Sequence, residues 1–66
     1  MIISNFTVPE LEYFREHCGF NGIELYVFEL RSQGASLDDI RFILGTTIDI
    51  VKKISQRVNR KIINVL

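Results

Sequence analysis

The sequence holds one cysteine, one histidine and one proline, and it has no tryptophan. Because Cys18 is alone, the chain cannot form an internal disulfide, and with His17 as its only histidine it cannot assemble a zinc site from its own side chains. A chain without disulfides fits a reducing cytoplasm, which is where we expect this protein.

Long apolar segments are also lacking. No stretch approaches the roughly 18 apolar residues of a membrane-spanning helix. The opening Met-Ile-Ile-Ser at residues 1–4 has no basic flank and no apolar run long enough for a signal peptide. We therefore expect a protein that is neither secreted nor embedded in a membrane.

The residue combinations that enzymes use are missing as well. The sequence offers no paired carboxylates placed for a cleft, no base beside a nucleophile and no glycine-rich phosphate loop. A chain of 66 residues makes one domain with one small core, because it buries only about 60% of the surface that it exposes when unfolded. We expect no catalytic activity, no cofactor, no metal and no small-molecule ligand.

The residues that are present predict one all-α domain over residues 1–66. Hydrophobic residues make up 47% of the chain and charged residues 24%, which is typical of a globular protein. Apolar residues recur at spacings of three and four, the period of an amphipathic helix. This pattern predicts four helices and no strand, at about residues 9–18, 22–33, 37–44 and 48–64.

Each predicted helix has an apolar stripe that we expect to face the core, and each has signals at its ends. Thr7, Asn21, Ser36 and Thr47 are candidate N-caps, and Asn21 and Ser36 have an acid three residues later, as in a capping box. Gly19, Gly34 and Gly45 follow the first three helices. The expected core residues are Leu11, Phe14, Cys18, Val27, Phe28, Leu30, Leu37, Ile40, Ile43, Leu44, Val51, Ile54, Val58, Ile62 and Val65.

Charge is distributed unevenly along a chain whose formal net charge is zero. Residues 1–45 hold three arginines and seven acids, a net charge of −4, whereas residues 46–66 hold five basic residues and one acid, a net charge of +4. Basic residues on a helix are often only its solvated face. The lack of any acid after Asp49 favours a phosphate-facing role instead.

A short helix, a tight turn at Gly45 and Thr46, and a long basic helix make the layout of a helix-turn-helix. The chain carries FNGIE from Phe20, LRSQGASLDDIRFILGTT from Leu30 and IDIVKKISQRVNRKI from Ile48. This series resembles sigma-factor region 4 and the LuxR/NarL-type effector domains, and the resemblance runs without gaps from Phe20 to Ile62. The corresponding patterns of that family are L-T-x-x-E and L-x-x-x-G-x-S-x-x-E-I-A-x-x-L-G-x-S, followed by the recognition helix.

The resemblance implies a small DNA-binding protein, a transcriptional regulator or sigma-region-4-like accessory factor, that reads duplex DNA with residues 48–62. In this interpretation the phosphates are contacted by Thr47 and Lys52. The base edges are faced by Asp49, Lys53 and Gln56. The flank of the site is anchored by Arg57, Arg60 and Lys61. Ile48 and Ile50 are open to three roles, as core edge, partner-binding surface or base contacts.

The apolar end of the chain predicts a homodimer held by Ile62, Ile63, Val65 and Leu66, which would place two reading helices about one DNA turn, roughly 34 Å, apart. Folding of residues 1–6 over this end within one chain is the alternative. A hypothesis of another class also stands. The same fold would then be a protein-interaction module that binds RNA polymerase or another regulator and has little affinity for DNA.

Overall fold

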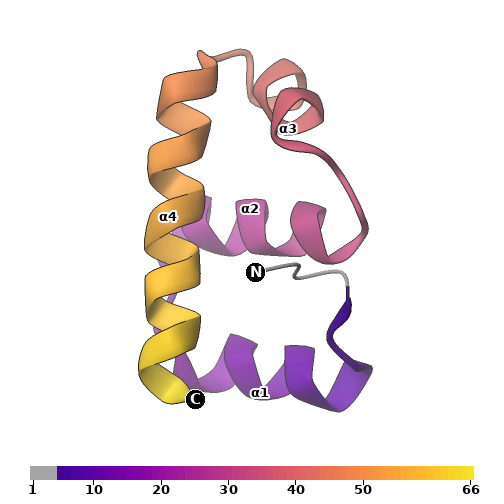
Figure 1. The fold of residues 1–66 in the computed structure, drawn as a ribbon, viewed down its shortest axis with the longest axis vertical. Coiled ribbons are helices and arrows are strands. Elements are labelled where there is room, and N and C mark those ends of the chain that lie inside the picture. Colours follow the sequence, from indigo (N-terminus) through magenta and orange to yellow (C-terminus); the bar gives the residue numbers. More distant parts are fainter. Residues whose placement is uncertain (1–4) are drawn as a thin grey trace.

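The computed structural model describes residues 5–66, and within that range the chain forms four α-helices and no strand (Figure 1). The helices are α1 (Val8–His17), α2 (Gly22–Ser32), α3 (Leu37–Leu44) and α4 (Ile48–Val65). Every helix begins and ends within one residue of its predicted bounds. The all-α prediction is therefore confirmed.

Helix α4 runs along the long axis of the molecule, and the other three helices lie along one side of it (Figure 1). The molecule measures 30 × 19 × 18 Å along its principal axes. Helix α3 lies beside the amino-terminal half of α4, α2 crosses its middle and α1 lies at its carboxy-terminal end. Each of the three shorter helices contacts α4, so α4 connects the whole fold.

Side-chain caps begin the helices where the sequence predicts them. Asn21 Oδ1 accepts a hydrogen bond from Glu24 N at 2.9 Å, and Ser36 Oγ accepts one from Asp39 N at 3.0 Å. In both pairs the acid accepts a hydrogen bond from the backbone N–H of the cap residue, which completes a capping box. Thr7 forms a third capping box at the start of α1. These caps satisfy N–H groups that have no partner inside the helix.

Helices α3 and α4 are joined by residues 45–47 alone. Gly45 has a φ of 64°, in the left-handed region that favours glycine. In that conformation its N–H donates to Phe42 O at 3.2 Å, and Thr46 N–H donates to Arg41 O at 3.2 Å. The last carbonyls of α3 are thus satisfied while the chain reverses into α4.

The core consists of two clusters of buried side chains, both closed by α4. The cluster near α3 is formed by Val27, Ile40, Val51 and Ile54. The cluster near α1 is formed by Phe14, Cys18, Phe28, Val58 and Ile62. Because α2 contributes Val27 to one cluster and Phe28 to the other, α2 and α4 together join the two halves of the domain.

Cys18 belongs to the core, as predicted. It is buried, and its Sγ lies 3.5 Å from Lys61 O, to which the thiol donates a hydrogen bond. Burial raises the pKa of the Cys18 thiol, because the thiolate would lose the solvation of water. The thiol is therefore a structural group that packs α1 against α4.

The prediction that Ile43 belongs to the core is wrong. In α3 the inward side chains are Leu37, Ile40 and Leu44, and Ile43 lies about 90° around the helix from their mean direction. It is consequently half exposed. The spacing of three from Ile40 suggested an inward position, but an eight-residue helix buries only a narrow face against α2 and α4.

No helix within residues 5–66 combines the length and the apolar character that a membrane crossing requires.

Candidate nucleic-acid interface

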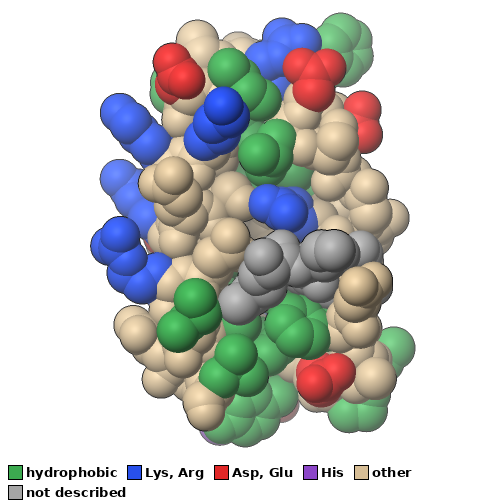
Figure 2. Space-filling model, in the orientation of Figure 1, with side chains coloured by type: hydrophobic (Ala, Val, Ile, Leu, Met, Phe, Trp, Pro, Cys, Tyr) green, Lys and Arg blue, Asp and Glu red, His purple; other side chains and the backbone are tan. Residues whose placement is uncertain are grey.

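The two faces of α4 differ sharply in character. Val51, Ile54, Ser55, Val58 and Ile62 face the core. At about 100° per residue, Lys53 and Arg60 point almost directly away from them, and Lys52 and Arg57 lie at the two edges of the exposed side. We call Lys52, Lys53, Arg57 and Arg60 the basic face. Lys and Arg side chains accordingly follow the outer edge of α4 in Figure 2.

The four members of the basic face are all exposed and have no ion-pair partner in the described part of the chain. Other cations are engaged within the molecule. Arg15 pairs with Glu29, and Arg41 pairs with Asp38 at 3.0 Å. The positive charge that is free to meet a partner is therefore concentrated on one helix.

Lys61 was expected to bind DNA, but in the structure its half-buried side chain is engaged by other groups of the domain. Its Nζ donates to Gly19 O at 3.1 Å and forms an ion pair with Glu24, a buried residue with a relative exposure of 2%. Lys61 lies nearer than the basic face to the buried side of α4, only about 80° from it. These two contacts connect α4 to the end of α1 and the start of α2, and the charge of Lys61 is neutralised by Glu24.

Hydrogen bonds to Lys61 and to the backbone N–H of Asn21 lower the pKa of Glu24 below its ordinary value, and the nearby charge of Arg57 adds to the effect. Sequence reasoning identified Glu24 only as a capping residue. Its spacing of three and four before Val27 and Phe28 puts it on the buried face of α2, and that spacing was the signal for its second role.

The polar residues predicted near DNA lie at the start and middle of α4. Thr47 is the N-cap, and its Oγ1 accepts a hydrogen bond from Ile50 N at 3.3 Å. Asp49 and Gln56 are exposed on the same side as Lys53. Asp49 stands in the first turn, where a negative charge stabilises the helix dipole.

The sequence did not decide between three roles for Ile48 and Ile50. In the structure Ile48 is half-buried and Ile50 is exposed. Ile48 therefore belongs to the edge of the core. Ile50 remains available at the surface beside the start of α4.

The residues predicted to form a dimer are divided by the structure. Ile62 is fully buried in the chain's own core, and Val65 packs against the same cluster, so these two side chains are used within one molecule. Ile63 and Leu66 are exposed at 59% and 76%. The alternative to the dimer, folding of residues 1–6 over this end, involves residues 1–4, which lie outside the described range. Within that range, Phe6 packs on Phe14 with ring centroids 4.9 Å apart.

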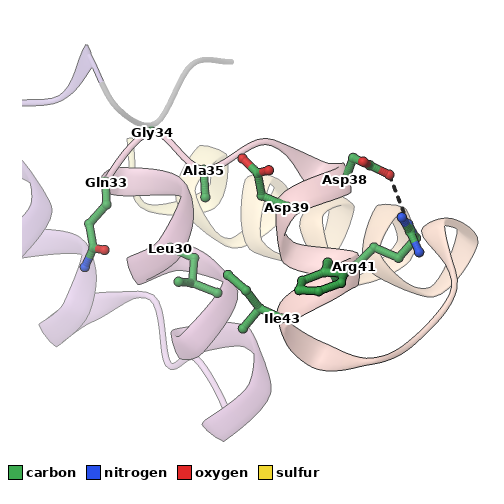
Figure 3. Close-up of a pocket in the computed structure, with 9 residues that line it drawn as sticks. Leu30, Gln33, Gly34, Ala35, Asp38, Asp39, Arg41 and Ile43 are labelled. Atoms are coloured by element: carbon green, nitrogen blue, oxygen red, sulfur yellow. Dashed lines mark hydrogen bonds and ion pairs between the residues drawn. The ribbon is translucent and has the colours of Figure 1, made fainter.

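A groove between α2 and α3 was not predicted. It has a volume of about 610 Å³ and lies among Leu30, Ala35, Phe42 and Ile43, with polar side chains including Asp39 around it. In Figure 3 the side chains of Leu30 and Ile43 approach each other across the floor of this groove. Phe42 is 81% exposed, because it lies about 170° from the buried face of α3. That angular position could have been read from the sequence.

Among residues 5–66, His, Cys, Asp and Glu side chains form no group of three that could hold a metal ion. The arrangement instead offers two kinds of surface, a cationic helix face and exposed apolar side chains. No protein-family model, curated protein or solved structure matches the chain.

Proposed function

We propose that the protein binds duplex DNA as a helix-turn-helix domain, in which α3 crosses the DNA backbone and α4 lies in the major groove. The observation that carries this proposal is the basic face of α4. Four exposed cations follow one side of an 18-residue helix without an ion-pair partner among the described residues. Such a row of charge binds phosphates and releases their counterions.

The surroundings of α4 support the same use. The three-residue connection at residues 45–47 brings the short helix α3 against the amino-terminal half of the long one. Asp49 and Gln56, on the same exposed side, offer an acceptor and an amide that can read base edges. We assign Lys52, Lys53, Arg57 and Arg60 to phosphates and the DNA flank, and we remove Lys61 from the site because Glu24 holds it.

The role of such a protein in a cell would be transcriptional regulation, either alone or as an accessory to a larger transcription complex. The resemblance of residues 20–62 to sigma-factor region 4 and LuxR/NarL-type domains supports this part of the proposal.

Neutralising two lysines tests the assignment of the basic face. In Lys52→Gln/Lys53→Gln, affinity for a random duplex at low salt should fall at least about tenfold, because two phosphate contacts are lost. Gln33→Glu/Tyr26→Glu is the matched control, since it lowers the net charge by the same two units at exposed positions on or next to α2. Fluorescence anisotropy gives both affinities, and circular dichroism checks the fold. Equal losses in the two variants would show that only net charge matters.

The exposed Phe42 favours a second candidate, a module that binds an apolar segment of another protein in the α2–α3 groove. Phe42→Ser separates the two candidates. If DNA is the ligand of α4, this variant keeps the wild-type affinity for duplex DNA. A wild-type protein without measurable affinity for duplex DNA would leave the groove as the better-supported binding surface.

A further inference from the structure

We infer that the first turn of α4 selects pyrimidines in duplex DNA, with Asp49 contacting a cytosine and Ile50 contacting a nearby thymine. The inference rests on the proposed function and concerns the bases that the same helix prefers. Asp49 and Ile50 are the second and third residues of α4, and both are exposed, Ile50 at 47%. In a helix that lies in the major groove, the amino-terminal residues are the ones that reach base edges.

Asp49 is an acid at the centre of a basic surface, and it is the only acid on α4. At about 100° per residue, it lies about 165° from the mean direction of the buried side chains of α4 and about 40° from Lys53. Lys52 and Lys53 stand three and four positions later, the spacing at which helical ion pairs form. Asp49 nevertheless makes no ion pair with any residue of the described range. Its carboxylate therefore faces outward and can accept hydrogen bonds from a ligand.

A carboxylate at this place lowers the affinity of α4 for most DNA. The phosphates that Lys52 and Lys53 attract repel Asp49, and its carboxylate loses water when it enters the groove. A helix that only binds phosphates gains nothing from such a charge. The charge gives specificity instead, because sites that offer it no hydrogen-bond donor are disfavoured.

Cytosine is the base that offsets this cost. In the major groove cytosine presents its N4 amino group, a donor, whereas thymine presents the O4 acceptor and guanine presents the acceptors N7 and O6. Adenine has a donor at N6, but its N7 acceptor repels a carboxylate that approaches the same edge. Only cytosine thus donates a hydrogen bond to Asp49 without also presenting an acceptor.

Ile50 supplies an apolar contact beside this acceptor. It lies about 100° around α4 from Asp49, at the edge of the exposed side that also carries Arg57. Neither core cluster of the described chain includes Ile50. Thymine is the one base with a methyl group in the major groove. An exposed isoleucine gains free energy by covering that methyl, because both apolar surfaces leave water.

Selection from a randomised duplex pool, followed by sequencing of the bound fraction, tests the inference on the full chain. The wild type should enrich cytosine at one position and thymine at a second position nearby. In the selected duplex, changing this cytosine to thymine should lower affinity at least about fivefold, the lower limit for a specific base contact. Replacing the thymine by uracil removes only the methyl group and should lower affinity about fourfold. Fluorescence anisotropy at a fixed salt concentration measures both changes.

Asp49→Asn gives the sharpest variant, because an amide offers a donor and an acceptor that match N7 and N6 of adenine. This variant should enrich adenine where the wild type enriches cytosine. Glu12→Gln is the matched control, since it removes the charge of one exposed acid on α1, and it should keep the preference for cytosine. Circular dichroism checks that both variants are folded.

The outcomes separate this inference from the proposed function. A wild type that binds the pool with a steep salt dependence but enriches no base overturns the inference and leaves the proposed function intact. A preference for cytosine that Asp49→Asn retains also overturns the inference, and it leaves Asp49 only its role at the helix dipole. An affinity that uracil leaves unchanged contradicts the contact assigned to Ile50. A wild type that binds no duplex overturns both proposals.

Discussion

At the scale of single residues, the ion pair between Glu24 and Lys61 does two things at once. It satisfies a buried carboxylate, and it connects α4 to the turn between α1 and α2 through the added hydrogen bond to Gly19 O. A buried carboxylate without such partners would be costly. The capping bond to Asn21 supplies the remaining partner, so that the carboxylate serves local and tertiary structure together.

Replacing this carboxylate should therefore cost stability. We expect Glu24→Gln to lower the free energy of unfolding at pH 7 by about 1.5–3 kcal/mol, the typical range for a hydrogen bond to a charged group. Urea unfolding followed by circular dichroism measures it. Glu10→Gln is the control, because Glu10 has the same place in the capping box of α1 but is exposed. Its loss should be clearly smaller; an equal loss would show that capping alone explains the effect.

The same residue gives a dependence on pH. The folded-state pKa of Glu24 lies below its ordinary value of 4.5, because Lys61 and Asn21 favour the ionised form. Its contribution is therefore present above that ordinary value and is lost as the pH falls through the lower, folded-state pKa. Melting temperatures of the wild type should fall more steeply below pH 4.5 than those of Glu24→Gln. Parallel curves would exclude Glu24 as a source of acid sensitivity.

At the scale of elements, the turn between α3 and α4 depends on one left-handed residue. Gly45→Ala should reduce the free energy of unfolding by about 1–2 kcal/mol, since a Cβ is strained at a φ of 64° although no atom crowds it. Gly22→Ala is the matched control. Gly22 is the first residue of α2, has no positive φ and has equal space, so alanine there should raise stability by up to about 1 kcal/mol. Similar effects at both glycines would contradict the account of the turn.

Sequence patterns predicted the elements well, because the caps and the glycines act within a few residues of themselves. Asn21, Ser36 and Gly45 each have the role that their neighbours in sequence imply. Partners far apart in sequence were not predicted. Arg31 donates to the buried Ser55 across 24 positions, and no local pattern indicates that bond.

In the candidate site, too, features set by local spacing were predicted and features set by tertiary packing were not. That α4 has a basic outer side followed from spacing alone, but Lys61 lies close enough to the boundary that only the packing of α1 and α2 decides its partner. Ile62 likewise continued the apolar stripe into the predicted dimer surface. The extent of α1 over the end of α4, which covers Ile62 and leaves Ile63 exposed, is a tertiary property.

At the scale of the whole molecule, α4 contributes buried side chains to both core clusters. A charge introduced at any of these buried positions should therefore destabilise the fold. We expect Val51→Asp to unfold the domain, because an unpaired charge would enter one of the only two clusters of the described chain. Ile50→Asp, one position earlier and exposed, is the control and should stay folded. Circular dichroism and thermal melts compare them. A cooperatively melting Val51→Asp variant would mean that α4 faces the other way.

The whole-molecule charge also explains why a net charge of zero is compatible with DNA binding. Seven of the eight acids lie on α1 to α3, many of them in caps and ion pairs, and only Asp49 lies on α4. Unpaired bases within residues 5–66 include the four of the basic face. A partner that approaches α4 meets the local field of that helix and not the sum over the chain. Salt should therefore act strongly on binding although the protein is neutral overall.

The salt dependence of duplex binding tests the central claim most directly. With four phosphate contacts from the basic face, the logarithm of the binding constant should fall with the logarithm of salt concentration at a slope of about −3 to −4, because each contact contributes about −0.9. In Lys52→Gln/Lys53→Gln the slope should become shallower by about 2, while the charge-matched Gln33→Glu/Tyr26→Glu keeps the wild-type slope. No measurable binding at low salt, or a slope that the two lysines do not change, would contradict the assignment of α4 as the DNA-binding helix.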